Sequence, residues 1–249
     1  MVEGDRIGID KFSNMSLLAM WKAVVASSGS DTALRVVTNL PIDDLSEYSR
    51  NYVRDLTFEY LDRYSNSLSK LLLKAGVLPG DRIGLHFHAS DPGEIISLLA
   101  VLKCAAIYVA LDNATCGRIV SDAGVRLVLV GGRENVGKST IFLPNKTPLL
   151  RIGRWGDISE GDELIRQPLP DPEPPRSSLD GAFNILYTSG SSGPSKGVVG
   201  REKGFVYRIG WMHQAFPFIK DKELVLRRTP LAFVDSVWEI WGALLAGVP

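Results

Sequence analysis

The chain of 249 residues is long enough for one large or two small domains, and its 45% hydrophobic content predicts a sizeable core. Lysine and arginine together number 28, as do aspartate and glutamate. No basic run occurs, so nucleic acid is excluded as a main partner, because binding its phosphate backbone needs clustered positive charge.

The sequence also argues against export and membrane insertion. Its N-terminus is polar and lacks the apolar core of a signal peptide. The most apolar window, from Ile95 to Leu111, is interrupted by Lys103 and is too short to span a bilayer comfortably. The two cysteines, Cys104 and Cys116, form no metal-binding or disulfide pattern. We therefore expect a cytoplasmic protein with buried, reduced thiols and no membrane span.

The first 130 residues alternate between helix and strand patterns. Apolar residues at helical spacing predict one amphipathic helix near the N-terminus and a second that is capped by Thr57. Asp91, Pro92 and Glu94 suit the first positions of a third helix, which is apolar nearly all round and therefore expected to be buried. Short apolar runs predict strands at 33–37, 82–87, 105–111 and 125–130. The alternation predicts an α/β fold with mostly parallel sheets flanked by helices.

Two stretches are predicted to be irregular. The polar residues 39–55 suggest a surface insertion. Residues 131–180 suggest an extended, solvated connector, because five prolines fall between Pro168 and Pro175. After this connector we expect a helix, a strand and a second helix at 203–214, 224–228 and 236–246.

The most informative stretch for chemistry is 184–199, NILYTSGSSGPSKGVV. A strand-like run leads into a turn rich in hydroxyl groups and glycine. Glycines let backbone N–H groups converge on an anion, hydroxyl groups add uncharged donors, and a lysine supplies mobile positive charge. This set suits a polyphosphate, and a flexible linker is the alternative. The candidate phosphate-binding residues are Thr188, Ser189, Gly190, Ser191, Ser192, Gly193 and Lys196.

Two other patterns indicate different sites. Gly132 to Ser139 matches the Gly-x4-Gly-Lys-Ser pattern of a P-loop nucleotidase. A P-loop needs a helix directly after its lysine, and nearby prolines oppose one, so a coincidence in a surface loop is favoured. His86 and His88 alternate as metal ligands on a strand would, but no third ligand stands at a helpful spacing, so no metal site is predicted.

TSGSSGPSKGV resembles the phosphate-loop signature of the adenylate-forming enzymes, the superfamily of acyl-CoA synthetases, luciferases and nonribosomal peptide synthetase adenylation domains. Ser192 stands where threonine is usual, and Ser195 stands where proline is usual, with Pro194 one place earlier. Further stretches are similar to three other adenylation signatures, in the expected order: LTFEYLDRYSNSLSKLLLKAGVLPGDRIGL, LLAVLKCAAIYVALD and PLAFVDSVWEIWGALLAG. Within the superfamily, the resemblance favours the branch that uses carrier-bound phosphopantetheine, and there the plant acyl-activating enzymes related to β-alanine-activating enzymes.

The resemblance implies that residues 1–249 form an incomplete N-terminal adenylation (AMP-binding) domain, with the C-terminal lid domain absent. The implied reaction activates a small carboxylic acid with ATP and Mg²⁺ to acyl-AMP and pyrophosphate. Transfer would follow to coenzyme A or to phosphopantetheine on a possible carrier protein. Lys196 would neutralise charge on the phosphates, while the main catalytic lysine would lie beyond this chain. We therefore expect the chain alone to be inactive. The alternative is a truncated, non-catalytic fragment that binds nucleotide or a partner.

The resemblance also implies that Val234, Asp235 and Trp238 line the acyl pocket. In the amino-acid-activating branch this segment reads Phe-Asp-any-Ser, and its aspartate pairs with the α-ammonium group of the substrate. Here Val234 takes that place and Asp235 follows. Because a buried ammonium can hardly lose its charge partner, we expect an acid without an α-amino group or a β-amino acid held differently. Alternatively, Asp235 only caps the helix. Glu202 is a further departure, since a histidine is usual at that place.

Overall fold

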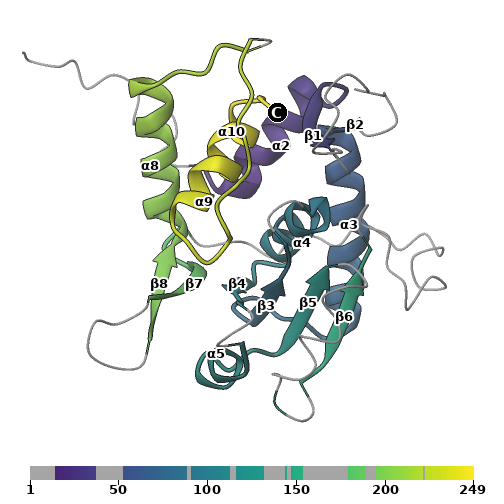
Figure 1. Ribbon diagram of the computed structural model, residues 1–249, viewed down its shortest axis with the longest axis vertical. Helices are drawn as coiled ribbons and strands as arrows, with labels where there is room; N and C mark the ends of the chain where they lie inside the picture. Colours follow the sequence, from purple (N-terminus) through teal and green to yellow (C-terminus); the bar gives the residue numbers. More distant parts are fainter. Residues whose placement is uncertain are drawn as a thin grey trace, which may run out of the picture.

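The computed structural model describes residues 15–37, 53–88, 91–112, 116–131, 144, 147–153, 179–188, 195–220 and 222–249. Within these residues a six-stranded sheet has the order β6-β5-β3-β4-β7-β8, and a separate pair of strands, β1-β2, lies beside the helices (Figure 1). All neighbours in the larger sheet are parallel except β7 and β8, which are antiparallel. The predicted α/β class with mostly parallel pairing is confirmed.

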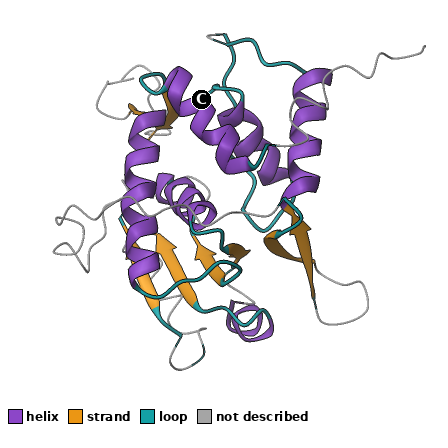
Figure 2. Cartoon of the chain, turned by 180° about the vertical axis from the view of Figure 1, so that it is seen from behind, coloured by secondary structure: helices purple, strands orange, loops and turns teal. Residues whose placement is uncertain are grey.

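The elements have the following bounds. The strands are β1 Thr32–Val37, β2 Val53–Thr57, β3 Arg82–His86, β4 Ile107–Ala110, β5 Leu127–Gly131, β6 Leu149–Ile152, β7 Ala182–Thr188 and β8 Lys196–Arg201. The helices are α2 Leu17–Ser28, α3 Phe58–Lys74, α4 Pro92–Lys103, α5 Cys116–Asp122 and α8 Glu202–Ala215. A continuous helical run then joins α9 Asp235–Val237, the π-helix η2 Trp238–Gly242 and α10 Ala243–Leu245. Figure 2 shows these helices around the strands from behind.

Helix starts agree with the capping signals in the sequence. The Thr57 side chain accepts a hydrogen bond from the backbone N–H of Tyr60 at 3.1 Å. Asp91 accepts one from the N–H of Gly93 at 2.9 Å, and Pro92 occupies the first helical position. Every residue of α4 is buried, as its continuous apolar pattern predicts. Cys104 and Cys116 are both free and buried.

Helices cover both faces of the sheet. Side chains alternate between faces along a strand, and in β5 Leu129 belongs to the large core that contains α4, while Val128 and Val130 belong to a smaller core with α5. The helices that follow the neighbouring strands β3 and β4 therefore pack on opposite faces. Such a reversal opens a crevice at the carboxyl edge of an α/β sheet, where ligands commonly bind.

The structure corrects four expectations. Strand β6 lies within the predicted connector and pairs with β5, and β8 is a strand where none was predicted. Val53 to Asp55 belong to β2 rather than to a surface insertion. Residues 224–228 form no strand, because their backbone groups bond elsewhere: the N–H of Val225 donates to Pro249 O, and that of Arg228 to Glu239. None of the described helices is long and apolar enough to cross a membrane.

A buried lysine ties three helices together. The Lys103 side chain, only 7% exposed, donates hydrogen bonds of 2.7 Å to Asp62, Ser65 and Asn66. Trp21 of α2 donates to the same carboxylate at 2.7 Å. A buried charge is tolerated when it is paired and hydrogen-bonded, and here the pairing fixes α2 and α3 against the end of α4.

Replacement of Lys103 should therefore be costly. We expect Lys103→Met to lower the free energy of unfolding by about 3–5 kcal/mol, because it leaves the Asp62 carboxylate without its charge partner. Urea unfolding measures the change. The exposed Lys22 on α2 is the matched control, and Lys22→Met should stay within about 0.5 kcal/mol of the wild type. Equal effects of the two variants would contradict this role of Lys103.

Candidate functional site

The antiparallel pairing of β7 and β8 brings together the two ends of the predicted phosphate-binding turn. Thr188, the last residue of β7, is paired with Lys196, the first residue of β8. Both are exposed, and within the described residues the Lys196 ammonium group forms no ion pair. An exposed threonine and an exposed lysine therefore stand at paired positions. Ser189, Gly190, Ser191, Ser192 and Gly193 lie outside the described residues, as does Gly132 to Ser139.

Two glycines let β8 lie close to the side chains of β7. A Cβ atom on Gly197 would lie 3.0 Å from Cζ of Tyr187, and one on Gly200 would overlap Oδ1 of Asn184. The Asn184 amide is itself fixed, since it donates a buried hydrogen bond of 2.8 Å to the Tyr108 hydroxyl. The side chains of β7 thus determine where β8 lies, and with it Lys196.

The second predicted site begins with the helical run from Asp235. Val234 is the residue before the first turn, with φ −60° and ψ −28°, and no side chain caps this helix end. Asp235 is therefore not the cap that the alternative interpretation expected. Its carboxylate is exposed and has no hydrogen-bond or ion-pair partner among the described residues, and the Val234 side chain is 66% exposed. These two neighbouring side chains remain available to a ligand.

Trp238 forms part of an aromatic cluster beside them. Its ring stacks on Phe218, with centroids 5.3 Å apart and planes at 15°, and lies 5.7 Å from the His213 ring. His213 Nε2 donates to the carbonyl oxygen of Gly242 at 2.7 Å. Burial lowers the pKa of His213, and the bond to Gly242 only partly opposes that shift. A neutral His213 thus fastens α8 to the π-helical segment, a helix type that is frequent at functional sites.

A charged network links this helical run to α4. Arg227 donates to Glu94 at 2.8 Å and to Glu239 at 3.3 Å. Glu239 also accepts from the backbone N–H of Thr229 at 2.8 Å and from its hydroxyl group. The network fixes the segment that precedes Val234. Sequence reasoning missed Arg227, Thr229 and Glu239, and treated Glu94 only as a helix-start residue. A carboxylate in an otherwise apolar, buried helix was the signal that could have found the network.

The two carboxylates of the network have opposite pKa shifts. Burial raises the pKa of Glu94 to about 7, although the nearby Arg227 charge lowers it in part. Burial also acts to raise the pKa of Glu239, but the hydrogen bonds from Thr229 and Arg228 and the Arg227 charge lower it below its ordinary value. Arg227 therefore has one firmly ionised partner and one that takes up a proton near neutral pH.

Two other expectations concern residues outside these two sites. Glu202 is buried and accepts a 2.7 Å hydrogen bond from the backbone N–H of Leu17, and burial raises its pKa. It joins α8 to α2. His86 is buried and His88 is exposed, and among the described residues no three histidine, cysteine or acidic side chains are grouped for a metal ion. Trp21 and Trp241 are core residues, at 0% and 1% exposure.

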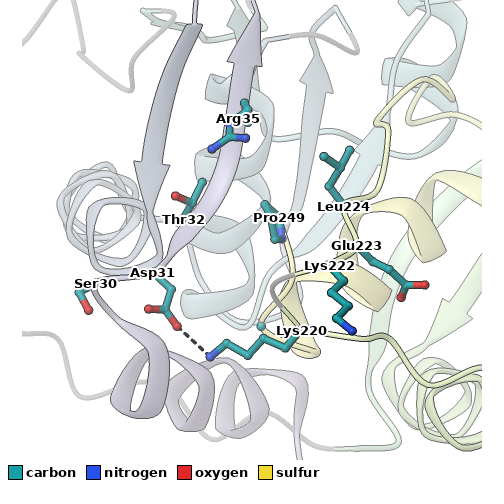
Figure 3. Close-up of a pocket in the computed structure, with 10 residues that line it drawn as sticks. Ser30, Asp31, Thr32, Arg35, Lys220, Lys222, Glu223, Leu224 and Pro249 are labelled. Carbon is teal, nitrogen blue, oxygen red and sulfur yellow. Dashed lines mark hydrogen bonds and ion pairs between the residues drawn. The ribbon is translucent and has the colours of Figure 1, made fainter.

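A cavity of about 460 Å³ lies where the segment after α2 enters β1, and no residue of β7 or β8 lines it (Figure 3). It is lined by Arg35, Lys220 and Lys222 but also by Asp31 and Glu223. The dashed contact in Figure 3 is the 2.8 Å ion pair of Lys220 with Asp31. Its charges are mixed and partly paired, so the cavity does not have the features of a polyphosphate site.

Comparison with known proteins shows which protein family this sequence matches. The family model of the AMP-binding enzymes matches residues 36–249. Zwittermicin A synthase ZmaJ of Bacillus cereus is 30% identical over 197 residues, which cover 76% of this chain and 34% of ZmaJ. Tyrocidine synthase 3 of Brevibacillus parabrevis is 28% identical over 193 residues, which cover 77% of this chain and 3% of that protein. This chain therefore spans about a third of the length of ZmaJ and far less of the second relative.

The fold is also similar to solved structures. NpsA-ThdA, an artificially fused adenylation-PCP di-domain from Klebsiella oxytoca, matches with a TM-score of 0.70 and 21% identity over 94% of this chain and 41% of that chain. At this identity the likeness concerns the fold, and it supports the parallel-rich sheet with flanking helices.

The raised pKa of Glu94 predicts a pH dependence of stability. Its pKa in the folded state, about 7, lies above its ordinary value of 4.5, so the folded chain binds this proton more tightly than the unfolded chain. The stabilisation is full below pH 4.5 and is lost as the pH rises through 7. We expect Glu94→Gln to flatten the decline of the urea midpoint between these pH values. The exposed Glu59 provides the control Glu59→Gln, and parallel curves for wild type and Glu94→Gln would refute the assignment.

Proposed function

This chain belongs to the AMP-binding enzyme family, and we propose that it supplies the triphosphate-binding and acyl-binding parts of an AMP-forming acid–thiol ligase. The reaction joins a carboxylate to the α-phosphate of ATP, so that acyl-adenylate forms and pyrophosphate leaves. The pairing of Thr188 with Lys196 at the two ends of a Gly- and Ser-rich turn is the observation that carries this proposal. It brings a hydroxyl group and an ammonium group, which has no ion pair among the described residues, to one turn.

The catalytic contribution of the turn is charge stabilisation and positioning. Thr188, the serine hydroxyl groups and the backbone amides of residues 189–193 would hold the β- and γ-phosphates. Lys196 would neutralise the charge that builds on the leaving pyrophosphate. Mg²⁺, when bound to ATP, supplies further neutralisation. None of these groups needs to change protonation, which suits a displacement governed by the alignment of the reacting groups.

We further propose that the acid carries its ammonium group away from the α-carbon. Val234 can neither accept a hydrogen bond from an ammonium group nor balance its charge. The Asp235 carboxylate can do both, and it stands one residue further along without a partner among the described residues. A β-amino acid held by Asp235, with Trp238 as a wall of the pocket, satisfies this arrangement. This is consistent with the proposed relation to the β-alanine-activating enzymes.

The acyl acceptor we propose is phosphopantetheine on a carrier protein, and coenzyme A is the alternative. The relatives include the synthases ZmaJ and tyrocidine synthase 3, and one fold neighbour is a fused adenylation-PCP di-domain. Because this chain spans only 34% of ZmaJ, we propose that residues 1–249 bind nucleotide but do not complete adenylation alone. Pyrophosphate exchange by the chain would contradict the second part of this proposal.

Titration with MgATP tests the phosphate site. We expect Lys196→Ala to weaken binding by about 10-fold or more, since a charge-assisted hydrogen bond is lost. Lys138→Ala removes the lysine of the P-loop pattern and should leave the affinity unchanged. If only Lys138→Ala lost affinity, the chain would instead be a P-loop nucleotidase. If neither variant changed the affinity, neither turn would be the nucleotide site.

Ligand-observed NMR tests the acyl site, because saturation transfer detects weak binding. With MgATP present, we expect transfer to β-alanine, and less to alanine and to propionate. Asp235→Asn should abolish the transfer to β-alanine, since the neutral amide cannot balance an ammonium charge. Asp180→Asn, at an exposed aspartate outside this site, is the control. Equal transfer to alanine and β-alanine would refute the substrate assignment.

A further inference from the structure

We infer that helix α5 clamps both sides of the β7–β8 turn, and that Arg118 and Asp122 are positioning residues for the phosphate site. The effect on nucleotide binding rests on the proposed function. The clamp itself, meaning the contacts of Arg118 and Asp122 with the two strand ends, is a property of the fold. Two side-chain contacts carry it. Tyr187 donates a 2.5 Å hydrogen bond to Asp122, and Arg118 donates one to the Ser195 hydroxyl.

The positions of these contacts in the sequence matter. Tyr187 directly precedes Thr188 at the end of β7, and Ser195 directly precedes Lys196 at the start of β8. Each end of the turn is therefore fixed one residue away from a predicted phosphate ligand. Within α5, Arg118 and Asp122 are four residues apart, which places them on one face of the helix. A single face of α5 thus contacts the end of β7 and the residue that precedes β8.

The helix itself is well anchored. Its apolar side chains Cys116, Ile119 and Val120 are at most 3% exposed, and they pack with Val109 of β4 and Val128 of β5. Because α5 is fixed to the sheet, its polar face offers a rigid reference for the turn. The Tyr187 hydroxyl remains a donor across the ordinary pH range, since burial and the bond to Asp122 raise the pKa of Tyr187 to about 12.

Strand β8 depends more than β7 on contacts with α5, because β8 is less buried. Phe183 and Leu186 of β7 are buried, whereas no residue of β8 is, and Val198 and Val199 are 54% and 56% exposed. As the edge strand of the sheet, β8 has a neighbour on one side only among the described strands. Burial of apolar side chains therefore does little to fix the start of β8. The hydrogen bond of Arg118 to Ser195 fixes it instead. Holding Thr188 and Lys196 in place before ATP binds reduces the ordering cost of binding.

Hydrogen exchange tests the clamp without any ligand. We expect the amides of residues 182–200 to exchange about 5-fold faster in Tyr187→Phe and in Arg118→Gln, because each variant loses one charge-assisted hydrogen bond. The melting temperature should stay nearly constant, since exposed polar contacts contribute little to global stability. Tyr207→Phe, at a partly exposed tyrosine on α8, is the matched control. Unchanged exchange of these amides in both variants would overturn the inference.

Titration with magnesium tripolyphosphate then tests the consequence for binding. We expect Tyr187→Phe and Asp122→Ala each to weaken affinity about 5-fold, and the double variant to be no weaker than either one, because both remove the same bond. If Lys196→Ala lost affinity while the clamp variants did not, the positioning role would be overturned and the proposed function would stand. If Lys196→Ala had no effect, the proposed function would fail, and faster exchange in the variants would still support the clamp.

Discussion

The antiparallel pairing of one edge strand with a parallel sheet is the constraint on which the proposed chemistry depends. β7 is the last parallel strand, and β8 returns beside it, so that Lys196 comes to lie opposite Thr188. A crossover helix after β7 would have carried the lysine away from the strand end, whereas a hairpin brings it back. A Cβ atom would overlap Asn184 of β7 at position 200 and would be in tight contact with Tyr187 of β7 at position 197, so glycine suits both places. The same glycines leave β8 with little apolar surface to bury, so polar contacts from α5 must help to place it.

The proposed acyl site depends on a second interaction, a half-buried arginine that is shared between two carboxylates. Arg227 joins Glu94, at the start of α4, to Glu239 in the helical run that contains Trp238. The segment between Arg227 and that run bonds to Glu239 through the backbone N–H groups of Arg228 and Thr229 instead of entering a sheet. Helices that pack on the sheet thus position both proposed sites. Helix α5 contacts the ends of the proposed phosphate site, and the start of α4 contacts the segment that leads to the proposed acyl site. Side-chain hydrogen bonds and ion pairs from these helices thus position the residues that would contact the ligands.

Much of this fold could be predicted from the sequence because its signals are local. The caps Thr57 and Asp91, the apolar run of α4 and the strands β3, β4 and β5 each depend on neighbouring residues, and all were predicted. Strands β6 and β8 could not be predicted in this way: β6 is short, β8 is rich in glycine, and the pairing partner defines each of them. At the site, Thr188 and Lys196 were predicted from residue type and spacing. The contact of Arg227 with Glu94 joins residues that are 133 positions apart in the sequence, and that of Arg118 with Ser195 joins residues 77 apart. The role of Glu239 depends on the same Arg227. No local sequence pattern contains such contacts.

We propose that this chain binds the phosphates of ATP at the segment between β7 and β8. Amide chemical-shift mapping by NMR, with MgATP added stepwise to the isotope-labelled chain, tests it most directly. We expect saturable shifts concentrated in residues 188–197, with smaller ones at Arg118 and Asp122 on α5. Shifts confined to residues 132–139, or none in the β7–β8 hairpin at saturating MgATP, would contradict it.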